Sequence, residues 1–426
     1  MADDILQDLP GSTEQDGDAR QPKPSTSSIT RRGALGLGAA VALLALAGCG
    51  KGSDGSQDST AEDAGDSSTS DTSATDEEAQ IEEALQNLTT EQKVCQLFCV
   101  RPESLVDVTM TAAGDKTRSA LEKHPVGGIC FFAQNLEDPD QTTEMLTNVK
   151  QFSTDICGLP MLCAVDEEGG TVARVASNSA FGVEDVGDMR DIGDAGDTDK
   201  AKDAAVTVGT YLKKLGFTMD FAPDADVCNN PESDTMARRS FGTTSDVVAP
   251  MVKAQVEGYL STGIGCCAKH FPGIGGATGD SESEPIVSEK TADEMAEEEL
   301  VPFQSAIEAG VPMIMVGHLS CPNITGDSTP ASLSKDIVTD MLRDRLGFDG
   351  VIITDSIGMG AIGANYTTEQ ATLAAIDAGV DMVLMPADFD AAYAAVLDAV
   401  SSGDITEDRL NDSVRRIIRM KRQLNG

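Results

Sequence analysis

Tryptophan is absent from this 426-residue sequence, and aromatic residues of all kinds make up only 4% of it. So few rings argue against a long cleft in which flat ligands stack on aromatic side chains, and they favour a small pocket. Basic residues are also scarce, because 31 Lys and Arg stand against 71 Asp and Glu, for a formal net charge of −40. Nucleic-acid binding needs a basic surface, so this composition excludes nucleic acid as a partner.

The chain has three histidines and ten cysteines, and no spacing between them resembles a zinc site. We therefore expect neither a metal nor another cofactor. Most cysteines stand in apolar, strand-like runs, where a thiol packs as a small hydrophobic group, and we expect mostly free thiols. The cysteines in such runs are Cys95, Cys99, Cys130, Cys163, Cys266 and Cys267.

Long hydrophobic runs are missing except near the N-terminus, where an apolar run extends from Ala34 to Ala47. A membrane-spanning helix needs about 20 such residues, so this run has the length of a signal-peptide core. The pair Arg31-Arg32 before it resembles a twin-arginine export signal. The ending Leu46-Ala47-Gly48-Cys49 resembles a lipobox, after which Cys49 would carry the lipid. An uncleaved N-terminal anchor is the alternative.

Composition divides the chain into three segments. Residues 1–49 form the predicted twin-arginine-type lipoprotein signal segment. Residues 50–80 are acidic and rich in Ser and Asp, so we expect a disordered tether. Residues 81–426 form the expected folded domain. These features predict an extracytoplasmic protein, lipid-anchored to the outer face of the cell membrane through Cys49; the oligomeric state is not indicated.

From residue 81 onward, short apolar runs alternate with longer amphipathic ones, the pattern of repeated βα units. Eight strands predict a closed (β/α)8 barrel as a single domain, with an open doubly wound sheet as the rival fold. The expected helices include 142–152, 201–215, 247–260, 292–309 and 334–346. The expected strands are 94–100, 128–133, 161–165, 217–222, 266–271, 312–316, 350–354 and 382–385.

Polar residues directly follow several of these strands, which places them at the C-terminal face where barrel enzymes keep their chemistry. Packing alone does not explain so many charged groups at one face. They are Asp166 to Gly170 after the third strand, Asp224 and Asp226 after the fourth, Lys269 and His270 at the end of the fifth, His318 after the sixth, and Asp355 after the seventh.

Four segments, in order along the chain, resemble glycoside hydrolase family 3, in its single-barrel β-N-acetylhexosaminidase branch. They are Asp166-x-Glu168-Gly169-Gly170-x-Val172-x-Arg174, Arg239-Ser240-Phe241-Gly242, Lys269-His270-Phe271-Pro272-Gly273 and Ile353-Thr354-Asp355-Ser356. The resemblance implies a retaining exo-β-N-acetylhexosaminidase that hydrolyses terminal β-linked N-acetylglucosamine-type sugars from cell-wall or glycan fragments. The alternatives are a catalytically weakened, lipid-anchored sugar-binding protein and a β-glucosidase-like hydrolase of the same family.

The resemblance places the nucleophile at Asp355, where it would form a covalent glycosyl-enzyme. A buried strand holds such a carboxylate with little positional freedom. The alternative role for Asp355 is to cap the next helix. The resemblance also implies that Asp166, Arg174, Arg239, Lys269 and His270 bind sugar hydroxyls, each with an internal salt bridge or core packing as its alternative. We expect Glu168 to support its neighbours, the glycines after it to let the backbone approach the sugar, and His318 either to contact the substrate or to pack.

One departure concerns the acid/base. Members of the family usually carry an Asp-Ser-His sequence in the loop after the fifth strand, with the histidine as acid/base and the aspartate as its partner. This chain reads Asp280-Ser281-Glu282 there. In one interpretation Glu282 is the acid/base candidate and Asp280 is its partner, which gives the two-carboxylate arrangement of retaining glycosidases.

Two other interpretations remain. Proton transfer is crippled and the protein mainly binds sugar, or another loop residue such as Glu284 donates the proton. The loop contains four glycines between Gly273 and Gly279, so we expect it to close over bound sugar as a lid.

Overall fold

The computed structural model describes residues 69–230, 233, 235–277, 279–281 and 283–425, with side chains described from residue 76 onward. The predicted signal segment, Cys49 and most of the predicted tether therefore lie outside the described residues, and so does Glu282.

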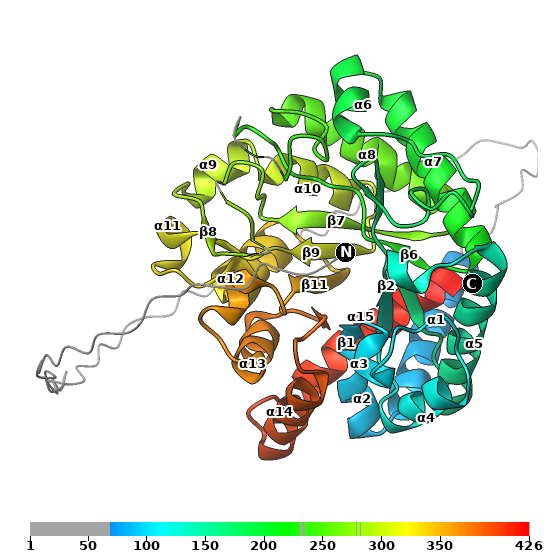
Figure 1. Cartoon of the computed structure of the whole chain (residues 1–426). Coiled ribbons are helices and arrows are strands. Elements are labelled where there is room, and N and C mark those ends of the chain that lie inside the picture. The colour runs from blue at the N-terminus through cyan, green and yellow to red at the C-terminus, as the bar shows by residue number, and fades with distance from the viewer. Residues whose placement is uncertain (1–68, 231–232, 234, 278, 282, 426) are drawn as a thin grey trace, which may run out of the picture. The chain divides into compact units, whose positions relative to one another are not determined.

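A closed barrel of eight parallel strands forms the centre of the fold (Figure 1). Every neighbouring pair runs in parallel, as the βα repeat predicts. The (β/α)8 barrel is therefore confirmed over the open sheet. The barrel strands are β1 (Phe98–Val100), β2 (Gly128–Phe131), β3 (Leu162–Val165), β6 (Met219–Asp220), β7 (Gly265–Phe271), β9 (Met313–Val316), β11 (Val351–Ser356) and β12 (Met382–Leu384).

The first strand was predicted too long. Residues 94–97 are buried, and all except Gln96 are apolar, but they belong to helix α2 (Thr90–Gln96) and its C-cap. A capping box starts this helix, because Thr89 accepts from the Gln92 backbone N–H and the Gln92 side chain accepts from that of Thr89. An apolar run of this length does not distinguish a buried helix from a strand, and the capping signal decides it.

Helices follow the strands and cover the outside of the barrel. Helix α5 shows why they form where they do: Asp138 caps its N-terminus, Pro139 occupies its first turn, and Gly158, at φ 74°, ends it. The covering helices are α3 (Glu103–Val106), α4 (Asp115–Lys123), α5 (Pro139–Cys157), α7 (Thr198–Leu215), α8 (Ser245–Ser261), α9 (Ala292–Glu297), α10 (Leu300–Glu308), the π-type helix η3 (Asp336–Arg345), α13 (Thr368–Ala378) and α14 (Phe389–Ser402).

The single helix expected over 292–309 is in fact two, α9 and α10. Pro302 lies in the first turn of α10, and since proline has no N–H, a continuous helix would lose its bond to residue 298. Short elements complete the loops: β4 (Glu167–Gly169) with β5 (Val172–Ala173), β8 (Ile286–Val287) with β10 (Leu319–Ser320), α6 (Met189–Ala195), α11 (Pro322–Thr325), α12 (Gly360–Gly363), η1 (Ala133–Asn135) and η2 (Ala331–Leu333).

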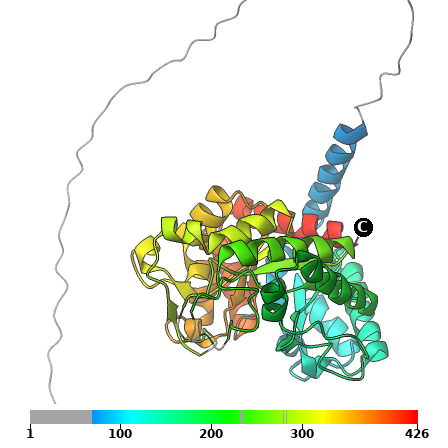
Figure 2. The ribbon, with the colours of Figure 1, turned by 90° about the horizontal axis from the view of Figure 1, so that it is seen from above.

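Helix α1 (Thr69–Gln86) lies beside the C-terminal helix α15 (Glu407–Asn425), as Figure 1 and Figure 2 show. Acidic α1 pairs with basic α15 through Glu78 to Arg419, at 3.0 Å, and Glu82 to Arg415. The helix therefore begins inside the segment expected to be disordered up to residue 80. Local composition missed it because its partner lies more than 300 positions away. Among the described helices, none is both long and apolar enough to cross a membrane.

Candidate active site

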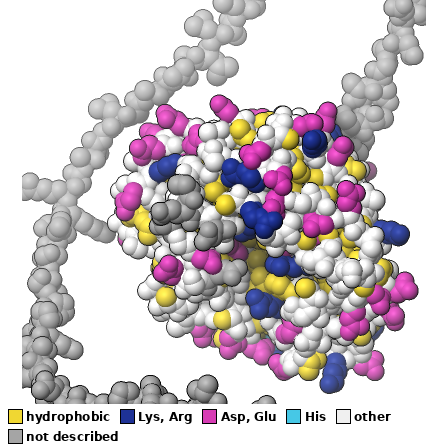
Figure 3. Space-filling view, turned by 45° about the horizontal axis from the view of Figure 1, so that its top comes forward, with side chains coloured by type: hydrophobic (Ala, Val, Ile, Leu, Met, Phe, Trp, Pro, Cys, Tyr) yellow, Lys and Arg dark blue, Asp and Glu magenta, His cyan; other side chains and the backbone are white. Residues whose placement is uncertain are grey.

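A cavity of about 490 Å³ opens at the C-terminal ends of the barrel strands, within the usual range of about 300–1,000 Å³ for small-ligand sites. Figure 3 shows a hollowed face where Lys or Arg and hydrophobic side chains meet, with Asp and Glu mostly around it. All the predicted sugar-binding and catalytic residues that the structure describes line this cavity. They are Asp166, Arg174, Arg239, Lys269, His270, Asp280 and Asp355.

Two cations are held at the cavity wall by carboxylates that follow β3. The Lys269 Nζ lies 2.7 Å from Asp166 Oδ1 and 2.7 Å from Glu168 Oε1. Arg239 donates from Nε and Nη2 to the two oxygens of Glu168, both at 2.8 Å. Glu168 is thus the shared partner of both cations, and it also lines the cavity. It supports its neighbours as the sequence predicted.

Charge pairing, more than burial, sets the protonation states here. Burial alone lowers the pKa of Lys269, but Asp166 and Glu168 outweigh it and raise that pKa above its ordinary value. Burial raises the pKa of Glu168, yet Arg239 and Lys269 more than compensate and hold it below its ordinary value. The site therefore keeps fixed charges in place for hydrogen bonds to a polar ligand.

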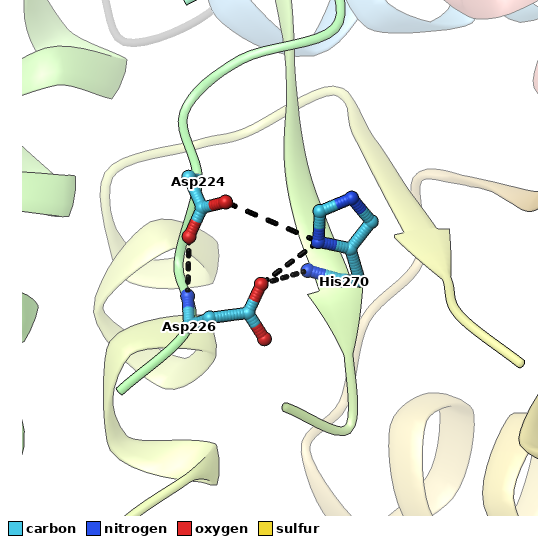
Figure 4. Close-up of side chains that lie close together, drawn as sticks. All are labelled: Asp224, Asp226 and His270. Atoms are coloured by element: carbon cyan, nitrogen blue, oxygen red, sulfur yellow. Dashed lines mark hydrogen bonds and ion pairs between the residues drawn. The ribbon is translucent and has the colours of Figure 1, made fainter. Parts of the chain in front are cut away.

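Lys269 and His270 are sequence neighbours, and strand alternation would send their side chains to opposite faces. Both nevertheless line the cavity, and the strand is irregular at this point: the Lys269–His270 peptide bond is cis, and the pairing of β7 with β9 shifts register between Ala268 and Phe271. The His270 Nδ1 lies 2.8 Å from Asp226 Oδ2 (Figure 4). The His270 Nε2 lies 3.5 Å from Arg239 Nη2. Asp226 thus fixes the imidazole with its second nitrogen toward the guanidinium.

Asp224, Asp226 and His270 have ligand atoms within 4.8 Å of one another, a composition that can hold a metal ion. Asp226 is already engaged, since Oδ2 accepts from the His270 backbone N–H at 3.2 Å and Oδ1 from that of Ile274 at 2.5 Å. The Arg239 guanidinium lies 3.7 Å from Asp224. Burial and Asp226 raise the pKa of Asp224 well above its ordinary value. We interpret this group as a hydrogen-bonded support for His270.

Asp355 stands near the end of β11, half-buried, and lines the cavity. Its Oδ1 accepts from the Ser356 backbone N–H at 2.7 Å. It does not cap the next helix, because α12 has Met359 at its N-cap. Burial raises the pKa of Asp355, but His270, His318 and the Ser356 N–H together hold it below its ordinary value. The carboxylate is therefore ionised at neutral pH, as a nucleophile must be.

His318 packs beneath the site and does not line the cavity. Its side chain is buried, with Nδ1 2.8 Å from Ser332 Oγ and Nε2 2.9 Å from the Ser356 carbonyl oxygen. Burial lowers its pKa. It therefore fixes the backbone just after Asp355, which decides between the two roles considered from the sequence.

The loop after β7 reaches the cavity through Asp280 and Ser281. The backbone N–H of Ala361, in α12, donates to the Ser281 carbonyl at 3.2 Å, which ties the loop to the segment following Asp355. Glu282 lies outside the described residues. Glu284 is exposed and does not line the cavity, so the structure does not favour it as the proton donor.

Part of the cavity was not foreseen. Arg101 after β1, Phe132 after β2 and Met385 after β12 line it. The guanidiniums of Arg101 and Arg174 lie 4.9 Å and 5.8 Å from the centre of the Phe132 ring. These residues follow strands of the same barrel face, which was the one available signal, but none stands in a recognised motif.

The two glycines after Glu168 serve a different purpose from the expected one. Neither lines the cavity. Gly169 has φ 101° and Gly170 φ 55°, and a Cβ on Gly170 would lie 2.1 Å from Asp188 Oδ1. They are required for the turn between β4 and β5 and for its packing against residues 186–188.

The cavity is large enough for a sugar, is surrounded by fixed carboxylates and cations, and lies at the C-terminal mouth of a closed (β/α)8 barrel. This arrangement is that of a (β/α)8-barrel enzyme. Residues 89–420 match the family profile described as glycosyl hydrolase family 3 N terminal domain. The chain belongs to glycoside hydrolase family 3.

Known relatives agree with this assignment. The chain is 32% identical over 350 residues to beta-hexosaminidase A of Pseudoalteromonas piscicida, covering 76% of this chain and 58% of the relative. It is 33% identical to a beta-hexosaminidase of Chromobacterium violaceum, covering 68% and 81%. A β-N-acetylglucosaminidase structure from Paenibacillus sp. superposes with a TM-score of 0.75 at 34% identity, covering 79% and 63%. The chain thus spans less than two thirds of the first and last of these proteins.

Proposed function

We propose that this protein is a retaining exo-β-N-acetylhexosaminidase that hydrolyses terminal β-linked N-acetylglucosamine-type sugars from cell-wall or glycan fragments. The observation that carries the proposal is the shared cavity, in which Asp355 faces the same space as the Lys269 and Arg239 cluster and Asp280 of the loop. The names of the relatives, beta-hexosaminidase and β-N-acetylglucosaminidase, support the choice of sugar.

In this mechanism Asp355 attacks the anomeric carbon. The bond to the leaving oxygen breaks as the loop acid protonates that oxygen, and a glycosyl ester forms on Asp355. The same loop group, now a base, then takes a proton from water, which attacks the anomeric carbon and releases Asp355. Two displacements preserve the β configuration. Asp166, Arg174, Arg239, Lys269 and His270 hold the sugar hydroxyls during both steps.

We assign the acid/base to Glu282, with Asp280 beside it. Asp280 and Ser281, the two residues before Glu282, line the cavity, which supports this assignment. A carboxylic acid at this place, together with Asp355, gives the two-carboxylate arrangement that most retaining glycosidases use.

Release of 4-nitrophenol from its β-N-acetylglucosaminide tests the proposal. We expect activity in the wild type and a loss of at least about 10⁴-fold in Asp355→Asn. Absence of wild-type activity together with tight N-acetylglucosamine binding would instead support a sugar-binding protein. Faster turnover of the matching β-glucoside would support a β-glucosidase-like enzyme.

The acid/base assignment needs substrates with different leaving groups. Glu282→Gln should lose about 10²–10⁴ in rate on a poor leaving group, but much less on 2,4-dinitrophenol, which leaves without protonation. Added azide should restore turnover on the activated substrate. Glu284→Gln is the matched control. A loss confined to Glu284→Gln would contradict the assignment, and unchanged poor-substrate activity in Glu282→Gln would indicate that the site lacks a working acid there.

We also propose that the protein is exported and anchored to the outer face of the membrane by lipid on Cys49, with residues 50–68 as spacer. Support comes from the arginine pair, the apolar run and the Leu-Ala-Gly-Cys ending. In cells fed a labelled fatty acid, the wild type should carry the label in the membrane fraction, whereas Cys49→Ala should not. Labelling of Cys49→Ala equal to the wild type would contradict this proposal.

A further inference from the structure

Three consecutive acidic residues follow β3, and only two of them belong to the site described above. Asp166 and Glu168 line the cavity and hold Lys269 and Arg239. Glu167, between them, points the other way, as alternation along β4 requires. It is completely buried, and no step of the proposed mechanism uses it. A buried carboxylate without a cation needs another explanation.

The Glu167 carboxylate accepts four hydrogen bonds. Three come from consecutive backbone N–H groups, those of Arg174 at 2.5 Å, Val175 at 2.7 Å and Ala176 at 2.7 Å. The fourth comes from the Tyr211 hydroxyl at 2.8 Å. Both oxygens act only as acceptors, which an ionised carboxylate can do and an amide cannot.

The segment held in this way carries Arg174, whose guanidinium lines the cavity. Nothing else in the described part of the chain fixes that side chain by a hydrogen bond or an ion pair. Its Nε is buried without a hydrogen-bond partner, and the Phe132 ring centre is 5.8 Å from Cζ. The position of the guanidinium therefore depends on its backbone, and three N–H groups of residues 174–176 are bonded to Glu167.

We propose that Glu167 is a positioning residue for substrate binding, whose carboxylate clamps the backbone of residues 174–176 and so aims Arg174 into the cavity. The inference rests on the proposed role of Arg174 in holding the sugar. It adds a residue that never touches the sugar but sets the geometry of one that does.

The electrostatics around Glu167 agree with a role other than stability. Burial raises its pKa, and the backbone and Tyr211 hydrogen bonds only partly offset this. Another buried acid, Asp220, accepts from the Glu167 backbone N–H at 2.9 Å and has its own pKa raised well above the ordinary value by burial. A carboxyl group with a raised pKa in the folded state makes folding less favourable as pH rises and the group ionises. The ionised carboxylate of Glu167 therefore lowers the free energy of unfolding.

A double-mutant cycle on the aryl N-acetylglucosaminide tests the inference. We expect Arg174→Gln to raise KM about tenfold and Glu167→Gln to raise it about fivefold, with kcat changing less than about threefold in the latter. If Glu167 acts through Arg174, the double variant should have the KM of Arg174→Gln alone, within about twofold. An unchanged KM in Glu167→Gln, or effects that multiply, would overturn the inference. If Glu167→Gln does not fold, Glu167→Asp, which withdraws the carboxylate by one methylene, takes its place.

Two control variants distinguish a specific effect on the position of Arg174 from a general loss of stability. Asp381 is also buried and accepts from the Ile352 backbone N–H at 3.0 Å and from Arg343 at 2.7 Å, but it does not line the cavity. Asp381→Asn should lower the melting temperature without changing KM. Tyr211→Phe removes one donor from Glu167 and leaves the three N–H bonds, so its KM should stay within about twofold of the wild type. A KM increase in either control equal to that of Glu167→Gln would contradict the clamp.

If the wild type is inactive, the proposed function is wrong, but the role of Glu167 can still be tested by sugar binding. Calorimetric Kd values for N-acetylglucosamine then replace KM in the same cycle. If the wild type is active but the effects of the two substitutions multiply, the role proposed for Glu167 is wrong and the proposed function stands.

Discussion

Replacing Glu168 by glutamine should destabilise the protein and disable the site together. Glu168 is 3% exposed as a residue and is the shared partner of Arg239, at 2.8 Å from two donors, and Lys269, at 2.7 Å. Glutamine keeps the shape but loses the charge. It also turns an N–H group toward a guanidinium or an ammonium group that needs an acceptor.

The size of the effect follows from burial and from the partners that remain. Removing one member of a buried ion pair costs roughly 3–5 kcal/mol, because the other charge stays buried. Asp166 still pairs with Lys269, and Asp224 lies 3.7 Å from Arg239, so we expect the low end, about 3 kcal/mol. The pKa of Glu168 is held below 4.5 in the fold. Its contribution is therefore complete above about pH 4.5 and is lost as the pH falls through the lower folded-state value.

Urea unfolding of the wild type and of Glu168→Gln at pH 7 measures this difference in the free energy of unfolding, with kinetics on the folded fraction. The variant should lose about 3 kcal/mol at pH 7 and show a large drop in kcat/KM. The control is Glu122→Gln, which breaks an exposed pair with Arg118 and should cost about 0.5 kcal/mol or less. A loss in Glu168→Gln no greater than in this control would refute the role given to the buried cluster.

Other consequences can be measured directly. Because the pKa of Asp355 lies below 3.8, the rate of glycosyl-enzyme formation from a dinitrophenyl glycoside should stay constant down to about pH 4; a fall centred above pH 5 would contradict an ionised nucleophile. The nine described cysteines are all free, and burial raises the pKa of Cys95, Cys163 and Cys321 to about 12. Thiol reagents should therefore leave native activity unchanged, and rapid inactivation would contradict this burial. An anionic Glu282 should repel phosphate, so turnover in phosphate buffer should match that in a neutral buffer of equal ionic strength, and faster turnover in phosphate would refute this.

The sequence predicted the structure best where the functional residues lie next to a clear local pattern of strands and helices. Asp355 was placed at the end of a buried strand because the apolar run Val351-Ile352-Ile353 and then Thr354 precede it, and the structure puts β11 there. The motif residues Asp166, Lys269 and His270 share one cavity because every βα unit ends at the same barrel face. The alternation of strands and helices therefore predicted the fold and the barrel face that holds the site, and the family resemblance predicted the individual site residues.

What the sequence did not reveal depends on contacts between distant positions. The helical state of residues 94–97 was decided by the capping box at Thr89, and helix α1 by its pairing with α15. Glu167 looked like a member of an acidic motif, and only the fold shows that it faces the backbone of residues 174–176. Arg101 and Met385 reach the cavity because barrel closure brings β1 beside β12.

The most direct test of the central claim is to trap the covalent intermediate and find the residue that carries it. The enzyme is inactivated with a 5-fluoro derivative of N-acetylglucosaminyl fluoride, digested, and analysed by tandem mass spectrometry. Retaining catalysis through Asp355 predicts a single glycosyl ester on the peptide that contains Asp355, and none in Asp355→Asn. A label on a different carboxylate, or an active wild type that forms no adduct and releases the α-anomer first, would contradict the claim.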